Sequence, residues 1–133
     1  MTTTGDEMLA LMPFAAKTGI VIDSAGPGQV TGRLAWDAEL CTAGGVLHGG
    51  ALMTLADSLG GVCAFLNLPE GASTATISSS ASFLRAVRGG AVTGTCRPLN
   101  VGRSVIVVQT EMRDDPGRLV AQVTQAQAVI AGP

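Results

Sequence analysis

The sequence is short of aromatic and charged residues. Its 133 residues include no tyrosine, one tryptophan and three phenylalanines, and only 14% are Asp, Glu, Lys or Arg. Nucleic-acid binding needs a basic surface, and single strands also need aromatic side chains on which bases stack. The net charge is −2, so the composition argues against a nucleic-acid partner.

Metal-ligand and export patterns are also missing. The three cysteines, Cys41, Cys63 and Cys96, are widely spaced and do not cluster with histidine or carboxylates. We therefore expect reduced thiols, with neither a metal nor a redox cofactor. The first residues, MTTTGDEMLALMPF, have no basic segment before their short apolar run. This argues against a signal peptide, and we expect a cytoplasmic protein.

Apolar residues, in contrast, are abundant. They make up 47% of the chain, and the mean hydropathy of +0.41 is high for a soluble monomer. We therefore expect a second copy of the chain to cover apolar surface. The length fits one domain over residues 1–133, because no repeat, low-complexity segment or linker interrupts the chain.

The chain is organised around the stretch Val46–Leu66, VLHGGALMTLADSLGGVCAFL. A helix starting near His48 would span about 27 Å and carry an apolar stripe at helical spacing. The stripe comprises Leu52, Leu55, Ala56, Leu59, Val62, Cys63 and Leu66. Asp57 and two glycine pairs argue against a membrane span, and no other segment looks membrane-bound. The pattern predicts a buried core helix wrapped by sheet.

Strand and turn signals surround this helix. We expect a short helix from Thr4 or Gly5 to Met12, a hairpin formed by 19–23 and 29–36, and a loop over 37–45. Four strands in a meander are expected after the helix: 72–87, 91–101 with an interruption at Pro98, 104–112 and 119–130. This order indicates an α+β fold, an antiparallel sheet of about six strands curled around one long helix.

The expected strand at 72–87 has two unlike faces. Alternation along a strand places Ala75, Ile77, Ala81 and Phe83 on one face and Thr74, Thr76, Ser78, Ser80 and Ser82 on the other. The hydroxyl-rich face fits either a solvent-facing edge or one wall of a polar site.

Asp57 most needs an explanation, because an ionised carboxylate is rarely buried without a partner. No basic residue lies three or four positions away, where the sequence has Met53, Thr54, Gly60 and Gly61. One interpretation is a narrow solvent-facing strip shared with Thr54 and Ser58. The other is a carboxylate in an enclosed apolar cleft, which suits a general base or a nucleophile.

His48, Gly49 and Gly50 stand at the start of the expected helix. Glycines there leave the first backbone N–H groups uncovered, and these donors, with the helix dipole, can stabilise a developing oxyanion. The plainer interpretation is a Gly-Gly entry needed for backbone packing, with His48 as a hydrogen-bonded structural residue.

The spacing of these groups bears on assembly. Gly49 and Asp57 are eight residues apart, which is about 12 Å along a helix axis. A reacting carbonyl needs its oxyanion donor and its attacking group within about 3 Å each. If both residues act on one substrate, a two-fold dimer with roughly antiparallel helices must bring Asp57 of one chain to Gly49 of the other.

The run Gly45–Ala51, GVLHGGA, followed by Leu55-Ala56-Asp57, resembles the GxxHGG…LAD motif of hotdog-fold acyl-CoA thioesterases. The resemblance is closest to the branch typified by the phenylacetate-pathway thioesterase. The later segments Phe83–Arg85 and Val101–Arg103 also resemble the family, so the similarity covers most of the chain. It implies a hotdog fold and hydrolysis of an acyl- or aryl-CoA thioester to the free acid and CoA.

The resemblance also implies roles for individual residues. Asp57 would attack the thioester or activate water against it, and the Gly49 N–H would polarise the carbonyl, with His48 shaping that site and Gly50 contributing to substrate or CoA binding. Thr76 falls near the position where relatives hold the water. Candidates for binding CoA are Arg85, Arg88, Arg103 and Ser104, in the region between Arg85 and Arg118 that holds six of the eight basic residues.

One position departs from the family pattern. Six residues before His48, relatives usually carry Asn or Gln, but this chain has Thr42, whose hydroxyl is shorter and lacks the two ends of an amide. Thr42 is the best argument for one alternative, a non-catalytic acyl-thioester binder, and an enoyl-thioester hydratase or dehydratase on the same fold is the other alternative that stays open. Met53 and the small residues nearby fit an aryl or a medium aliphatic acyl group, carried on CoA or on acyl carrier protein. The oligomer is expected to be a dimer or a dimer of dimers.

Overall fold

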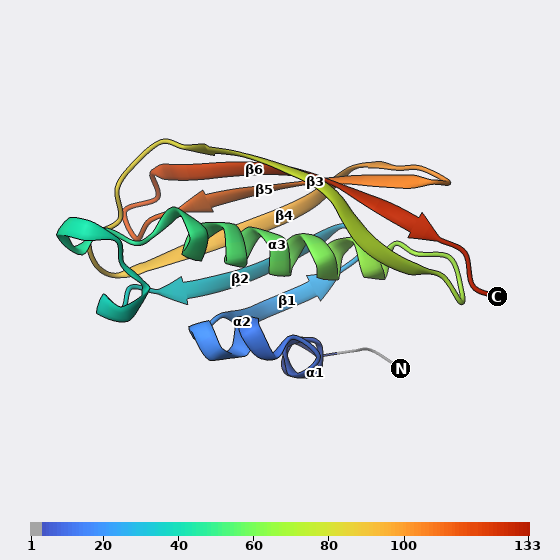
Figure 1. Ribbon diagram of the computed structural model, residues 1–133, viewed down its shortest axis with the longest axis horizontal. Coiled ribbons are helices and arrows are strands. Elements are labelled where there is room, and N and C mark those ends of the chain that lie inside the picture. The colour runs from blue at the N-terminus through green and yellow to red at the C-terminus, as the bar shows by residue number, and fades with distance from the viewer. Residues whose placement is uncertain (1–3) are drawn as a thin grey trace.

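The computed structural model describes residues 4–133. Its elements in chain order are α1 (Gly5–Ala10), α2 (Pro13–Thr18), β1 (Val21–Gly26), β2 (Gln29–Ala35), two short 3₁₀ turns (Ala38–Leu40 and Ala43–Gly45), α3 (Gly49–Leu66), β3 (Ser73–Phe83), β4 (Ala91–Val101), β5 (Val105–Arg113) and β6 (Leu119–Ile130). The six strands form one antiparallel sheet that curls around α3, and every strand contacts that helix (Figure 1). The expected α+β fold is confirmed.

The central helix begins where the sequence predicts. His48 caps it, because the imidazole Nδ1 accepts a hydrogen bond of 2.8 Å from the Gly50 N–H. By length and hydropathy α3 is the one helix among residues 4–133 that could cross a membrane. Within the fold it is instead a core helix, with nine buried residues facing the sheet. The predicted stripe is buried except for Leu66, which is half-buried at the end of the helix.

The strand order differs from the expected meander. The order across the sheet is β1-β2-β4-β5-β6-β3, so only β4, β5 and β6 form a meander. β3 pairs with β6 at the far edge, and the segment 84–90 then crosses to bring β4 beside β2 (Figure 1). Local sequence patterns specify strands and turns but not which strands pair, and for this reason the expected adjacency of the third and fourth strands was wrong.

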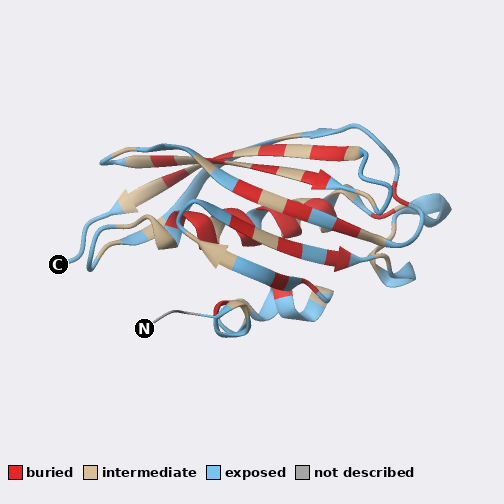
Figure 2. Ribbon diagram, turned by 180° about the vertical axis from the view of Figure 1, so that it is seen from behind, coloured by how far each residue is buried: buried red, intermediate tan, exposed pale blue. Residues whose placement is uncertain are grey.

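Burial alternates along β2, β4, β5 and β6, because one face of the sheet covers α3 and the other faces outward (Figure 2). The sheet approaches α3 closely at Gly32 and Gly94, which are register partners on β2 and β4. A Cβ on either residue would lie within 2.8 Å of the Leu59 side chain. Glycine at both positions therefore lets the sheet contact the helix directly.

A β-bulge in β3 corrects the predicted faces of that strand. The register with β6 shifts between Thr76 and Ser78, so Thr76 is paired with Gln127 and Ser79 with Gln125. A bulge adds one residue to one strand and reverses the alternation beyond it. The face toward α3 therefore carries Thr74 and Thr76 before the bulge and Ser79, Ala81 and Phe83 after it. Strict alternation had put the threonines and Ala81 on opposite faces.

The N-terminal part contains one helix more than expected. α1 ends at Ala10, and α2 starts at Pro13, which occupies the first helical position. Proline is favoured at that position because its fixed φ suits a helix and its missing N–H has no intrahelical acceptor. Interpreting Pro13 only as a helix stop was therefore wrong. α1 contacts β1, and α2 contacts α3.

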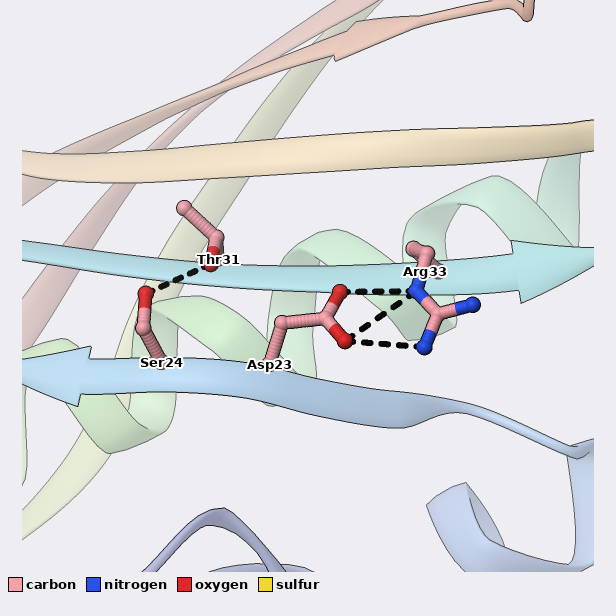
Figure 3. Close-up of polar contacts among 4 residues, drawn as sticks. All are labelled: Asp23, Ser24, Thr31 and Arg33. Atoms are coloured by element: carbon pink, nitrogen blue, oxygen red, sulfur yellow. Dashed lines mark hydrogen bonds and ion pairs between the residues drawn. The ribbon is translucent and has the colours of Figure 1, made fainter.

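The β1–β2 hairpin is tied together by side chains on its outer face. Arg33 donates to both carboxylate oxygens of Asp23, at 2.8 Å for the shortest pair, and the hydroxyls of Ser24 and Thr31 lie 2.6 Å apart (Figure 3). All four residues are at the surface, where such pairs contribute roughly 1 kcal/mol or less. The apolar face of the hairpin therefore contributes most to its position on α3.

Candidate active site

A cavity of about 520 Å³ lies beside the middle of α3. Its lining residues come from α2, α3, β3 and β6: Met12, Phe14, Ala15, Met53, Thr54, Asp57, Ser58, Gly61, Thr74, Ala75, Thr76, Ser79 and Gln127. One wall is apolar, and the other carries hydroxyl and amide groups. Asp57 belongs to this lining but is exposed in the single chain. The enclosed cleft expected around the carboxylate is therefore not formed by one chain alone.

Gln125 of β6 holds the Asp57 carboxylate. Its Nε2 donates a hydrogen bond of 2.8 Å to Asp57 Oδ1, and the side chain is only 2% exposed. The amide reaches this position because Gly60 has no side chain, and a Cβ there would overlap Gln125 Oε1. Sequence reasoning missed Gln125, since a glutamine in a strand is usually expected to face solvent.

Gln127 is the second glutamine on this face of β6. It is 1% exposed, and its Oε1 accepts a hydrogen bond of 3.1 Å from the Thr76 hydroxyl; the Thr74 hydroxyl lies 3.5 Å away and donates at 2.8 Å to the Ala128 carbonyl. Its Nε2 has no hydrogen-bond partner within residues 4–133. The predicted site residue Thr76 thus lies in the Asp57 cavity, anchored to a buried amide that the sequence analysis did not identify.

The N-terminus of α3 presents backbone donors, as expected. Gly49 is the first helical residue, so its N–H has no intrahelical acceptor. The imidazole of His48 has a structural role as the helix cap, and because Nδ1 is an acceptor in that bond, the neutral ring carries its proton on Nε2. His48 and Gly50 line a cavity of about 320 Å³ that shares Phe14 and Thr54 with the Asp57 cavity.

Gly49 itself lines another cavity, of about 430 Å³, together with Thr42, Phe83 and Arg85. Thr42 is exposed, and its side chain makes no capping hydrogen bond to the short turn that follows it. Its hydroxyl is therefore free to face the Gly49 cavity. One chain places Gly49 and Asp57 on separate cavities, as their spacing along α3 requires.

The candidate CoA-binding residues divide into two groups. Arg85 lines the Gly49 cavity, and Arg88 lines a neighbouring one of about 440 Å³ with Asp114 and Arg118. Arg103 and Ser104 belong to the β4–β5 turn, at the end of the sheet where α3 finishes (Figure 1). One chain therefore does not bring the four residues together.

The arginines near the start of α3 are partly neutralised by acidic residues. Arg118 forms an ion pair of 2.8 Å with Asp114. Desolvation opposes ionisation of Asp114, but hydrogen bonds from Arg118 and the charge of Arg85 outweigh it and lower the pKa of this carboxyl. Of these arginines, Arg85 has the more direct access to the Gly49 cavity.

The three cysteines are free thiols, as expected for reduced residues. Cys63 and Cys96 are buried, and a hydrogen bond to Cys96, together with burial, raises the pKa of Cys63. A neutral buried thiol is a poor nucleophile. Neither residue lines the Asp57 cavity, and Asp57 is the one ionisable side chain among its lining residues.

Comparison with known proteins identifies the family. Residues 44–121 match the model of the Thioesterase superfamily. A protein of Vibrio cholerae provisionally named an esterase is 46% identical over 76 residues, which cover 57% of this chain and 51% of that protein, so the match spans about half the relative's length. The 1,4-dihydroxy-2-naphthoyl-CoA hydrolase of Escherichia coli is 35% identical over 86 residues, covering 65% of this chain and 63% of that enzyme.

A solved structure agrees over nearly the whole chain. The crystal structure of a thioesterase from Haemophilus influenzae superposes with a TM-score of 0.92 at 29% identity, covering 98% of this chain and 93% of that one. The region that matches the family model, residues 44–121, includes the helix cap, α3 and the β3 residues that line the Asp57 cavity. The chain therefore belongs to the thioesterase superfamily, a family of thioester hydrolases, and has its hotdog fold.

Proposed function

We propose that this protein hydrolyses acyl-CoA thioesters to a free acid and CoA. The observation that carries the proposal is the Asp57 carboxylate, held by Gln125 on the wall of a cavity large enough for an acyl group. Membership of the thioesterase superfamily supports it, as does the similarity to a relative named a CoA-thioester hydrolase.

The site is completed by a second copy of the chain. Gly49 and Asp57 line separate cavities of one chain, but a two-fold axis between antiparallel α3 helices brings each Asp57 to the partner's Gly49. The Gly49 N–H then stabilises the oxyanion that forms on the thioester carbonyl. His48 orients this first turn through its cap, and Thr42 lines the cavity beside the carbonyl.

The carboxylate can act in either of two ways. As a general base, Asp57 takes a proton from water while the water oxygen bonds to the carbonyl carbon; the C–S bond then breaks, and CoA leaves as a thiolate that is protonated. As a nucleophile, Asp57 attacks the carbonyl carbon, the C–S bond breaks and CoA leaves as a thiolate that is protonated; water then hydrolyses the resulting anhydride to the free acid and the regenerated Asp57 carboxylate. In both routes the oxyanion is stabilised by the same backbone N–H.

The CoA moiety is assigned to the arginines near the start of α3. Arg85 lines the same cavity as Gly49 and is positioned for a phosphate, with Arg88 further along the surface. Arg103 and Ser104, at the other end of the chain's own sheet, contact the same CoA only if the partner supplies them. No metal is required in this scheme, since the charge that develops is stabilised by the backbone.

The test is a set of acyl-CoA thioesters, aryl and medium-chain aliphatic, with release of free thiol followed in time. We expect turnover of at least one of them. An enoyl-CoA substrate distinguishes a hydratase from a thioesterase, because hydration consumes the double bond without releasing thiol. Binding of a non-hydrolysable CoA analogue without thiol release from any member of the set would instead identify an acyl-thioester binder.

Gln125→Leu is expected to lower kcat about tenfold with little change in KM. The variant removes a hydrogen bond to a charged group, which is typically worth about 1.5–3 kcal/mol, and leaves the carboxylate free to rotate away from the substrate. Steady-state kinetics on the best acyl-CoA measure the effect. Gln122→Leu, on the outward face of the same strand, is the matched control, and equal kcat values for the two variants would contradict the positioning role.

A further inference from the structure

We propose that Gln127 is a further catalytic residue that binds the attacking water through its Nε2. This inference rests on the proposed thioester hydrolysis. It assigns a role to a residue that belongs to the Asp57 cavity but that neither the motif at α3 nor the charged residues of the chain would single out.

The first observation is an unpaired donor in a buried place. Gln127 is 1% exposed, and its Nε2 has no partner within residues 4–133, although its Oε1 accepts a hydrogen bond from the Thr76 hydroxyl. Buried polar groups without a hydrogen bond are rare in native proteins because they lose their hydration without compensation. Gln127 belongs to the lining of the Asp57 cavity, so a water bound within that wall can satisfy this buried donor.

The second observation is the position of Gln127 next to the residue that holds Asp57. Gln125 and Gln127 lie two residues apart on the same face of β6, about 7 Å along the strand. Gln125 donates directly to Asp57, and Gln127 is the next residue on this face of the strand, so a water bound in the cavity can bridge the Gln127 amide and the carboxylate. Gln127 and Asp57 both line the same cavity.

The hydrogen-bonding groups match what a nucleophilic water needs. Thr76 donates its hydroxyl proton to Gln127 Oε1, so the lone pairs of that hydroxyl remain as acceptors. A water among the three residues accepts a hydrogen bond from Gln127 Nε2 and donates one proton to Asp57 and the other to Thr76. One lone pair is left free on the water oxygen, and it forms the bond to the thioester carbonyl carbon as Asp57 takes the proton.

The test is kinetic and uses Gln127→Met, which keeps the length of the side chain but has no donor. We expect kcat for acyl-CoA hydrolysis to fall about 10- to 100-fold, as for other losses of reactant positioning, with KM changed less than twofold. Gln109→Leu is the matched control, since Gln109 is also a strand glutamine bonded to a threonine hydroxyl, at 3.3 Å, but lies outside the cavity.

Hydroxylamine separates water binding from a structural role. It is a stronger nucleophile that replaces water and gives the acyl hydroxamate and CoA, so the rate of hydroxamate formation should fall much less in Gln127→Met than the rate of hydrolysis. Thr76→Val, on the edge strand β3, gives a second variant that leaves the core intact. The effects of the two substitutions on kcat should not be additive, because both remove a hydrogen bond to the same water.

The outcomes distinguish the two proposals. Wild-type hydrolysis with an unchanged kcat in Gln127→Met overturns this inference alone. A raised KM at constant kcat, or equal losses of hydrolysis and hydroxamate formation, also overturns it, since the amide would then contact the acyl group or only support the fold. Absence of thiol release by the wild type from every acyl-CoA overturns the proposed function and this inference with it.

Discussion

Asp57→Asn lowers kcat for acyl-CoA hydrolysis by about 100-fold or more, within the range found when a general acid or base is lost. The amide is the same size as the carboxylate, and its oxygen can still accept the hydrogen bond that Gln125 donates to Asp57. Position and packing are therefore retained, while the ability to take a proton or to attack the carbonyl is lost. Initial rates of thiol release at saturating substrate measure the change.

The control for this variant is Glu70→Gln, which removes a carboxylate from an exposed residue in the turn after α3. We expect its kcat to equal that of the wild type. The melting temperatures of both variants should stay close to the wild-type value. If folded Asp57→Asn turned over substrate at nearly the wild-type rate, neither the general-base nor the nucleophile role could stand.

Gly49→Pro should lower kcat by about 10²–10³-fold, the usual cost of losing one oxyanion donor. Proline removes the N–H assigned to the oxyanion, and it is well tolerated at the first position of a helix. His48, which precedes it, has an extended backbone with φ −62° and ψ 137°, the conformation that proline requires of its neighbour. The substitution therefore removes one donor and keeps the helix.

Gly49→Ala is the matched control for this substitution. It adds the same Cβ, which would lie 3.3 Å from the ring of Phe83, but it keeps the N–H. We expect a much smaller loss of kcat in Gly49→Ala, and comparable losses in the two variants would assign the effect to the Phe83 contact rather than to the missing donor.

Mixing the two inactive variants tests the dimer directly. In a heterodimer of Asp57→Asn with Gly49→Pro, one site combines both substitutions and the other combines an intact Asp57 with an intact Gly49. Random exchange of subunits should restore about a quarter of the wild-type activity if the site is shared across a two-fold axis. Mass spectrometry of the mixture verifies that heterodimers form, and their inactivity would contradict a shared site.

The sequence was most informative where local chemistry decides the structure. The start of α3 and its apolar stripe were predicted from the glycines at the start of the helix and from helical spacing, and the structure confirms them. Strand pairing was less accessible, because β3 pairs with β6, which follows it in the chain only after β4 and β5. The bulge beside Ile77 also follows from that pairing rather than from a local pattern.

The candidate site shows the same division. Asp57, Gly49 and His48 stood out because a charge in an apolar helix and glycines at its start are visible in the chain itself. Gln125 and Gln127 did not, since strand glutamines are expected to face outward. Both glutamines lie an even number of residues from buried Val123 and therefore on the same face of the strand. This pattern becomes informative only once the helix is known to lie on that face.

The bare Cα of Gly60 links the packing of the core to the chemistry of the cavity. Gln125 Oε1 occupies the space that a side chain on Gly60 would fill, and the other end of the same amide holds the carboxylate. Any larger residue at this position must push either the helix or the amide aside, and each movement carries Asp57 with it. Close packing of the core and the orientation of the Asp57 carboxylate therefore depend on the same atoms of Gly60 and Gln125.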